Sequence, residues 1–323
     1  MRRLIFPRDR SLIYWGPLAV FWLVWLAILG FDNIVPVFET YWRSSVTMIA
    51  GSFVAGATPL GGGAVAFPVL TKVLHVDSLD ASIFSLFIQS VGMTFATLYF
   101  ISRKINIDWH VIKYASIGSF LSLPFGLAFV ALDNTTIRFI FSEFIIFCAF
   151  MILWDRRHSK EKNDISVYWP IAFGFAGGLL TAKIGSGCDA ILYFYLVFVC
   201  RGCIRRSIPT TVCFMAINSI YASAWLLMMI EPSDFVVGSW WSSAPVVSLG
   251  APLGAFVLSK LKMGQTISLV VTIICLEVAT TLMFVPFSLF DKVTILITVG
   301  ILSLYTRWDL TRAKRVGLMS GQP

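Results

Sequence analysis

Two glycine clusters with polar neighbours are the residues of this chain best suited to chemistry. The first reads Thr58-Pro59-Leu60-Gly61-Gly62-Gly63, and the second reads Lys183-Ile184-Gly185-Ser186-Gly187-Cys188-Asp189. A helix does not continue through such a cluster, because Gly costs roughly 1 kcal/mol relative to Ala and Pro about 3 kcal/mol. Backbone N–H groups left open where a helix restarts attract negative charge, since the helix dipole stands behind them. The clusters therefore predict binding of a small anionic solute.

Ionisable side chains flank the second cluster. We expect Lys183 to supply positive charge to the anion and Asp189 either to pair with Lys183 or to accept a coupling proton. The alternative is a structural ion pair that holds the turn. Glu143 and Glu277 lie in the middle of apolar segments. They predict a proton relay or, alternatively, neutral side chains satisfied by a neighbouring helix.

Two amide–hydroxyl pairs, Gln89-Ser90 and Asn218-Ser219, follow the glycine clusters at similar distances. We expect them to form part of a substrate-binding wall; otherwise they form hydrogen bonds between helices, worth under about 2 kcal/mol. The predicted substrate-binding residues are Gly61, Gly62, Gly63, Gln89, Ser90, Lys183, Gly185, Ser186, Gly187, Asp189, Asn218 and Ser219. The candidate ion-coupling residues are Asp189, Glu143 and Glu277.

Composition shows what kind of element holds these residues. Of the 323 residues, 58% are hydrophobic and 13% are charged. A soluble domain has about 45–50% hydrophobic and about 25% charged residues. Apolar runs of about 20 residues are long enough to cross a bilayer. The net charge of +8 comes from basic residues in short loops, which favours membrane orientation over nucleic-acid binding. The predicted partners are a lipid bilayer and a small anion, with no nucleic acid.

The apolar runs predict an all-α integral membrane protein. Ordinary spans fall at about 12–30, 82–101, 111–132, 135–154, 208–229, 239–259, 264–285 and 288–306, and the glycine clusters interrupt 46–74 and 167–200. If both interrupted segments are re-entrant hairpins, 20 of the 25 Lys and Arg lie on one side; if both cross, only 15 do. Because basic residues gather on the cytoplasmic side, the first arrangement is favoured. It gives about eight transmembrane helices plus two re-entrant or broken helical hairpins, with both termini cytoplasmic.

The two halves share an order of features. In the first, Gly61-x-Gly63 is followed after 26 residues by Gln89 and after 35 more by Pro124-Phe125-Gly126. In the second, Gly185-x-Gly187 is followed after 31 residues by Asn218 and after 34 more by Pro252-Leu253-Gly254. Each unit contains three crossings, so the second copy is inverted. Inverted repeats with discontinuous helices are typical of secondary transporters, whose sites lie near the bilayer midplane.

This organisation divides the chain into five parts. They are a basic tail with the first transmembrane helix (1–45), a first repeat (46–154), a basic cytoplasmic loop (155–167), a second, inverted repeat (168–285), and a last transmembrane helix with a basic cytoplasmic tail (286–323).

The segment Gly51–Leu70 resembles the sulfite exporter TauE/SafE family, which carries a G-G-G-x(4)-P element near the start of each half. Gly61, Gly62, Gly63 and Pro68 match that element, and Ala81-Ser82 begins a span like the helix that follows it. Gly174–Leu196 and Ile208–Tyr221 carry the likeness in the second half, which lacks the triple glycine and the trailing proline. The resemblance covers roughly 46–306 and implies an inner-membrane carrier for sulfite, sulfoacetate and similar anions.

These observations predict a secondary transporter, an exporter of a small anion such as sulfite or an organosulfonate, that works by alternating access in the bacterial inner membrane. A channel, or an importer of another small organic acid anion, is the alternative. The chain has no G-x-x-x-x-G-K-[ST], H-E-x-x-H or G-x-S-x-G motif, so we expect neither ATP hydrolysis nor an enzyme. We expect no catalytic residue, metal or cofactor, and whether the protein forms a homodimer stays open.

Overall fold

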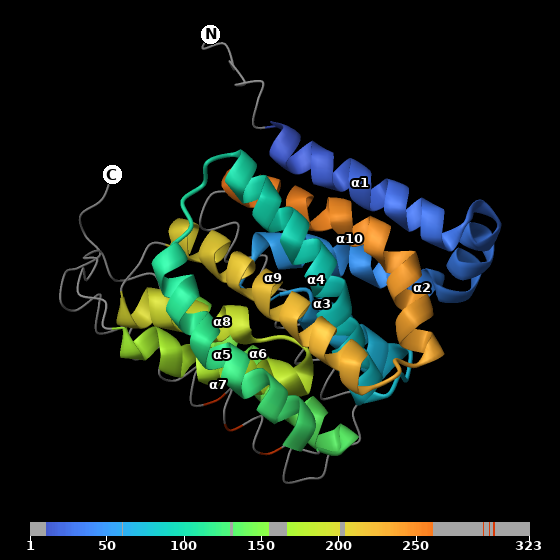
Figure 1. Ribbon diagram of the computed structural model, residues 1–323. Coiled ribbons are helices and arrows are strands. Elements are labelled where there is room, and N and C mark those ends of the chain that lie inside the picture. The colour runs from blue at the N-terminus through green and yellow to red at the C-terminus, as the bar shows by residue number, and fades with distance from the viewer. Residues whose placement is uncertain are drawn as a thin grey trace.

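The computed structural model describes residues 11–59, 61–129, 132–154, 167–200 and 204–260, together with positions 293, 297 and 300. Within these residues the chain is helical and contains no strand (Figure 1). The predicted spans 264–285 and 288–306, with Glu277, lie outside the described residues. So do most of the basic loop 155–167 and the two terminal tails.

The helices follow the predicted spans closely. In chain order they are α1 (Ser11–Leu29), α2 (Phe31–Ala57), α3 (Gly63–Pro68), η1 (Val69–Val73), α4 (Ser78–Ser102), α5 (Trp109–Phe129), α6 (Asn134–Trp154), α7 (Tyr168–Ile184), α8 (Cys188–Phe194), η3 (Tyr195–Val199), α9 (Ile204–Met229) and α10 (Asp234–Lys260). The helices α1, α4, α5 and α10, and the Arg206–Met229 part of α9, are long and apolar enough to cross a membrane. The chain is therefore a helical integral membrane protein.

One predicted connection is helical instead. The predicted span 12–30 and the predicted segment 46–74 leave a connection between them, but α2 begins directly after Gly30 and runs to Ala57, with a kink at Tyr41. Its amino-terminal part carries Asp32, Glu39 and Pro36. The charged residues interrupt the apolar run there, and apolar runs are what reveal a span.

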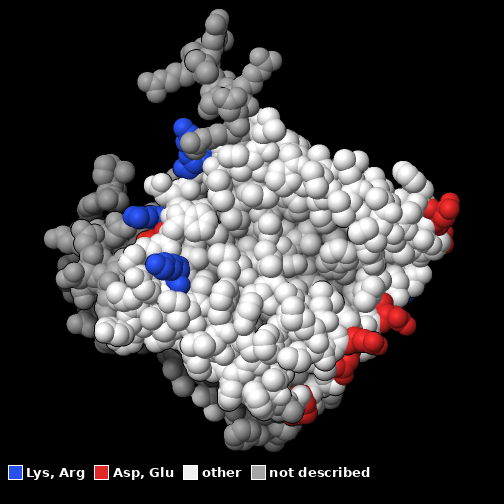
Figure 2. Space-filling model, viewed as in Figure 1, with Lys and Arg blue, Asp and Glu red and all other residues white. Residues whose placement is uncertain are grey.

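On the face shown in Figure 2, charged side chains lie at two opposite ends of the bundle. Lys and Arg gather at one edge, Asp and Glu at the opposite edge, and an uncharged surface lies between them. At the acidic end the Ser233 hydroxyl before α10 donates to Asp80 Oδ2 on α4 (2.8 Å). At the basic end Asp108, before α5, pairs with Arg206 on α9 at 4.0 Å. Many large apolar side chains on this bundle are exposed, among them Leu23 of α1 at 66%, as expected for a surface that faces lipid.

The helix α1 runs antiparallel to α4. The Tyr14 ring lies 6.1 Å from the Tyr99 ring, and the Phe21 ring lies 5.3 Å from the Phe95 ring. The start of α1 and the end of α4 therefore lie at the same end of the bundle. A single crossing by segment 46–74 would have put them at opposite ends.

Both glycine clusters form turns between two helical arms. The turn after α7 contains Gly185 (φ +69°) and Gly187 (φ +123°), and the turn after α2 contains Gly61 (φ +69°); side chains rarely tolerate these angles. In the second hairpin, α8 folds back along α7: the position that a Cβ atom would take at Gly177 lies only 3.5 Å from Ile191 Cβ. In the first hairpin, the Cβ position of Gly62 lies 3.3 Å from the Gly51 oxygen.

Each returning arm is short and ends in a π-helix. The first comprises α3 and η1, and the second comprises α8 and η3. At 1.5 Å per residue, 11 or 12 residues reach about 17 Å, roughly half of a 30 Å hydrocarbon core. The two arms are therefore too short to cross a bilayer.

Two close helix pairs frame the hairpins: α2 packs on α10, and α7 packs on α5. A Cβ atom at Gly56 would overlap the carbonyl oxygen of Ala251, and one at Gly174 would overlap that of Ala115. Glycine thus allows backbone-to-backbone approach, as in other membrane helix pairs. The first arm of each hairpin is held by a helix from the other half of the chain, while α4 and α9 cross between the two pairs (Figure 1).

Candidate functional site

The two glycine turns meet inside the bundle. The position that a Cβ atom would take at Gly61 lies 2.8 Å from Asp189 Oδ2, 3.0 Å from Gln89 Oε1 and 3.3 Å from Ser186 Oγ. These four residues, called the Gly61 cluster below, come from the first turn, the second hairpin and α4. Segments more than 120 residues apart in sequence thus supply one small group of polar atoms.

The oxygens of the Gly61 cluster are buried without hydrogen-bond partners. Gln89 is 2% exposed, and Ser186 and Asp189 are 0% exposed. Within the described structure Gln89 Oε1, Ser186 Oγ and Asp189 Oδ2 accept or donate no hydrogen bond. Because such an atom costs about 1–3 kcal/mol to bury unpaired, three of them beside one another indicate a place built for a ligand.

The amide of Gln89 fixes the cluster to the second hairpin. Its Nε2 donates to the Gly185 carbonyl at 2.8 Å and to Ser85 Oγ at 2.8 Å. Ser85 is buried and was not predicted as a site residue. Its spacing of four residues from Gln89, on the same face of a helix, is the signal that could have found it.

Asp189 and Lys183 both make contacts to the backbone near the second turn. The Asp189 Oδ1 accepts the Ala190 N–H at 3.0 Å. Lys183 lies in the last turn of α7, where its carbonyl accepts the Ser82 hydroxyl at 3.0 Å. The roles expected of the two side chains, including an ion pair between them or a coupling proton on Asp189, stay predictions.

The remaining glycines shape the contact between the hairpins. The Cβ position of Gly63 lies 2.7 Å from Ser186 Cβ, so only glycine lets the first turn approach the second this closely. Gly185 lies against the Ser82 backbone, and Gly187 packs against Leu180. Thr181 Oγ1 accepts the Cys188 N–H at 2.8 Å and closes the second turn.

Other predicted residues bond within their own helices or have no described bond to the Gly61 cluster. Asn218 and Ser219 are fully buried on α9 and donate to carbonyls of their own helix. Among the described contacts none joins them to the cluster. Asn218 Oδ1 also lacks a partner. Glu143 lies partly buried on α6.

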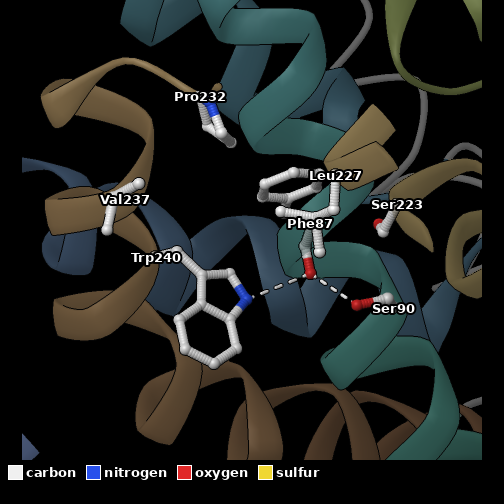
Figure 3. Close-up of a pocket in the computed structure, with 7 residues that line it drawn as sticks. All are labelled: Phe87, Ser90, Ser223, Leu227, Pro232, Val237 and Trp240. Atoms are coloured by element: carbon white, nitrogen blue, oxygen red, sulfur yellow. Dashed lines mark hydrogen bonds between the residues drawn. The ribbon is translucent and has the colours of Figure 1, made fainter. Parts of the chain in front are cut away.

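Ser90 lines a different space, an apolar pocket of about 290 Å³ between α4, α9 and α10 (Figure 3). Its hydroxyl and the Trp240 indole N–H both donate to the Phe87 carbonyl, at 2.7 and 3.3 Å. The pocket is otherwise lined by Ser223, Leu227, Pro232 and Val237. It offers any ion little compensation for lost hydration, and the region of the Gly61 cluster and the two glycine turns is the better candidate site.

The chain was compared with known protein families. A family model described as Sulfite exporter TauE/SafE matches residues 45–306. The chain belongs to the sulfite exporter TauE/SafE family. The match covers both glycine turns and most of the bundle, and it confirms the resemblance carried by Gly61, Gly62, Gly63 and Pro68. No curated protein and no solved structure matches the chain.

Membership in TauE/SafE accounts for the apolar helices and implies a membrane transporter of sulfite-type anions. It is a transporter family, in agreement with the expectation that the chain is not an enzyme. A small anionic substrate and membrane lipid are the partners that follow from the family.

Proposed function

We propose that this TauE/SafE-family protein is a secondary transporter of the bacterial inner membrane, which exports a small anion such as sulfite or an organosulfonate by alternating access. The observation that carries the proposal is the meeting of two glycine turns at buried, unpaired polar atoms. An opened helix break inside an apolar bundle must line a cavity, since its peptide groups cannot face lipid. A transported solute belongs at such a place.

An inverted repeat is part of the proposal, and the helix pairing supports it. Gly126 of the first Pro-x-Gly element packs on Ala182, just before the second turn. Gly254 of the second element packs on Phe53 and Ala57, just before the first turn. Exchanging the two halves turns one contact into the other, as a twofold axis in the membrane plane requires. The π-helices η1 and η3, at matching places, support the same relation.

The first glycine turn is the better half of the site for the anion. It contains Gly61, Gly62 and Gly63 and no acidic residue. In the second turn the Asp189 carboxylate already accepts a backbone N–H, that of Ala190. We place the anion beside the first turn, with Lys183 contributing positive charge and the other predicted substrate-binding residues lining its path.

Gly63→Ala tests the proposal, with Gly16→Ala as its matched control. An added Cβ at Gly63 meets Ser186, whereas nothing lies within 4 Å of one at Gly16 on α1. In reconstituted vesicles we expect Gly63→Ala to lower sulfite flux at least about tenfold, a loss of about 1.4 kcal/mol, and Gly16→Ala to match the unmodified protein. Equal flux through both variants would place the transported anion elsewhere.

A gradient experiment separates a carrier from the alternative of a channel. Vesicles with and without a proton or sodium gradient are supplied with equal sulfite on both sides. A carrier coupled to an ion accumulates sulfite only when a gradient is present. A channel leaves the two compartments equal, and that result would refute ion-coupled transport.

A further inference from the structure

We propose that the Gly61 cluster binds a monovalent metal cation, sodium, and that this ion is the one coupled to anion movement. Only the transport role rests on the proposed function; binding itself is measured separately. All three unpaired atoms of the cluster are oxygens, namely a carboxylate, an amide and a hydroxyl oxygen. Oxygen ligands of this kind suit hard cations.

The three oxygens surround one point. Asp189 Oδ2 and Gln89 Oε1 lie 2.8 and 3.0 Å from one point, so they are at most 5.8 Å apart. Ser186 Oγ lies 3.3 Å from the same point. The Gln89 amide cannot turn to present its NH₂ group without losing its bonds to Gly185 and Ser85. Its Oε1 is thereby held toward the cluster as an acceptor.

On the side of the two helix carboxyl ends, the backbone favours positive charge as well. The helix α2 ends at Ala57 and α7 ends at Ile184, directly before the two turns. Helix carboxyl ends carry partial negative charge, and in discontinuous transporter helices such ends coordinate Na⁺ or H⁺.

The single carboxylate of the cluster decides the charge of the ion. One monovalent cation neutralises Asp189, whereas a divalent ion would leave a net positive charge inside an apolar bundle, at a high cost. One proton on Asp189 bridges two of the oxygens, while a metal ion contacts all three. Neutralising Asp189 also removes the repulsion between its carboxylate and an anion at the first turn.

The experiment measures sodium binding without transport. Purified full-length protein in sodium-free choline buffer is titrated with sodium chloride, potassium chloride or choline chloride, and thermal unfolding is followed. Since a ligand of the folded state raises stability with its concentration, we expect a saturable rise in Tm with sodium chloride alone. Equal responses to sodium and choline chloride would overturn the proposal, as would a response to pH with none to sodium.

Variants locate the ion. Asp189→Asn is expected to weaken the apparent sodium affinity at least about tenfold, and Asp32→Asn, which removes an exposed carboxylate at the start of α2, to leave it unchanged. Ser186→Ala removes one oxygen with little loss of volume. If Asp189→Asn does not fold, Ser186→Ala is used instead and is likewise expected to weaken the apparent sodium affinity. A sodium response of unmodified strength in the variants at 189 and 186 would refute the site.

The same samples separate this inference from the proposed function. If sulfite flux needs no sodium and the protein binds none, the cation site is refuted and the proposed transport function is retained. If the protein binds sodium but transports no sulfite-type anion, the proposed transport function is refuted and the cation site is retained.

Discussion

Gln89 and Ser90 are neighbours in sequence and take part in different structures. The Gln89 side chain bonds to the second hairpin, while Ser90 lines the apolar pocket beside Trp240. Consecutive residues on a helix point about 100° apart, so one wall seldom uses both. The sequence singles out Ser186, Asp189 and Gly61 through their place at helix breaks, and Gln89 as part of an amide–hydroxyl pair that recurs in the second half. The structure brings these four together.

The bond from Gln89 to the Gly185 carbonyl predicts a cost for losing the amide. We expect Gln89→Leu to destabilise the protein by about 1–3 kcal/mol, because a buried carbonyl loses its partner. Ser90→Ala, one residue away, breaks only a bond to the Phe87 carbonyl of its own helix. We expect it to change stability by less than about 0.5 kcal/mol. Thermal unfolding in detergent measures both, and equal effects would contradict the bridging role of Gln89.

Lys183 is predicted to act through its charge. If it supplies positive charge to the anion, Lys183→Gln lowers sulfite flux about tenfold while expression stays normal. Lys113→Gln, at an exposed lysine of α5, serves as the matched control. Unchanged flux in Lys183→Gln would remove this lysine from the mechanism.

At the scale of elements, the contact between α2 and α10 has a counterpart between α7 and α5. We expect Gly56→Ala and Gly174→Ala to destabilise the protein by similar amounts, about 1–3 kcal/mol or more, because each added methyl group overlaps a backbone carbonyl. Gly16→Ala, which has open space, should be neutral or slightly stabilising, since alanine is the better helix former. Unfolding midpoints of the three variants provide the comparison. A large loss in only one of the two helix pairs would argue against their equivalence.

Elements were predictable where the sequence is uniformly apolar. The spans at 82–101, 111–132 and 239–259 agree with α4, α5 and α10 within a few residues. The kink at Tyr41 and the π-helices were not predicted, because they depend on packing between segments distant in sequence. At the kink, for example, a Cβ atom at Gly238 would overlap the Tyr41 ring.

For the whole molecule, the separation of charge predicts its orientation. Lys104 follows the end of α4, whereas Glu231 lies just before Ser233, which bonds to Asp80 near the start of α4. In a cysteine-free background we expect Lys104→Cys to react with a membrane-impermeant maleimide only in inside-out vesicles. Glu231→Cys should react only in intact cells, since basic loops face the cytoplasm. Labelling of position 104 from the periplasm would reverse the proposed topology.

The packing of α2, from the first half of the chain, on α10, from the second half, also has a consequence during translation. Ser44 of α2 bonds to Ser239 of α10, 195 residues later in the sequence. A ribosome adding about 5–20 residues per second needs roughly 10–40 s to make that stretch. During this interval the earlier glycine turn is already in the membrane without its covering helix, so an insertase or chaperone has a defined window in which to shield it.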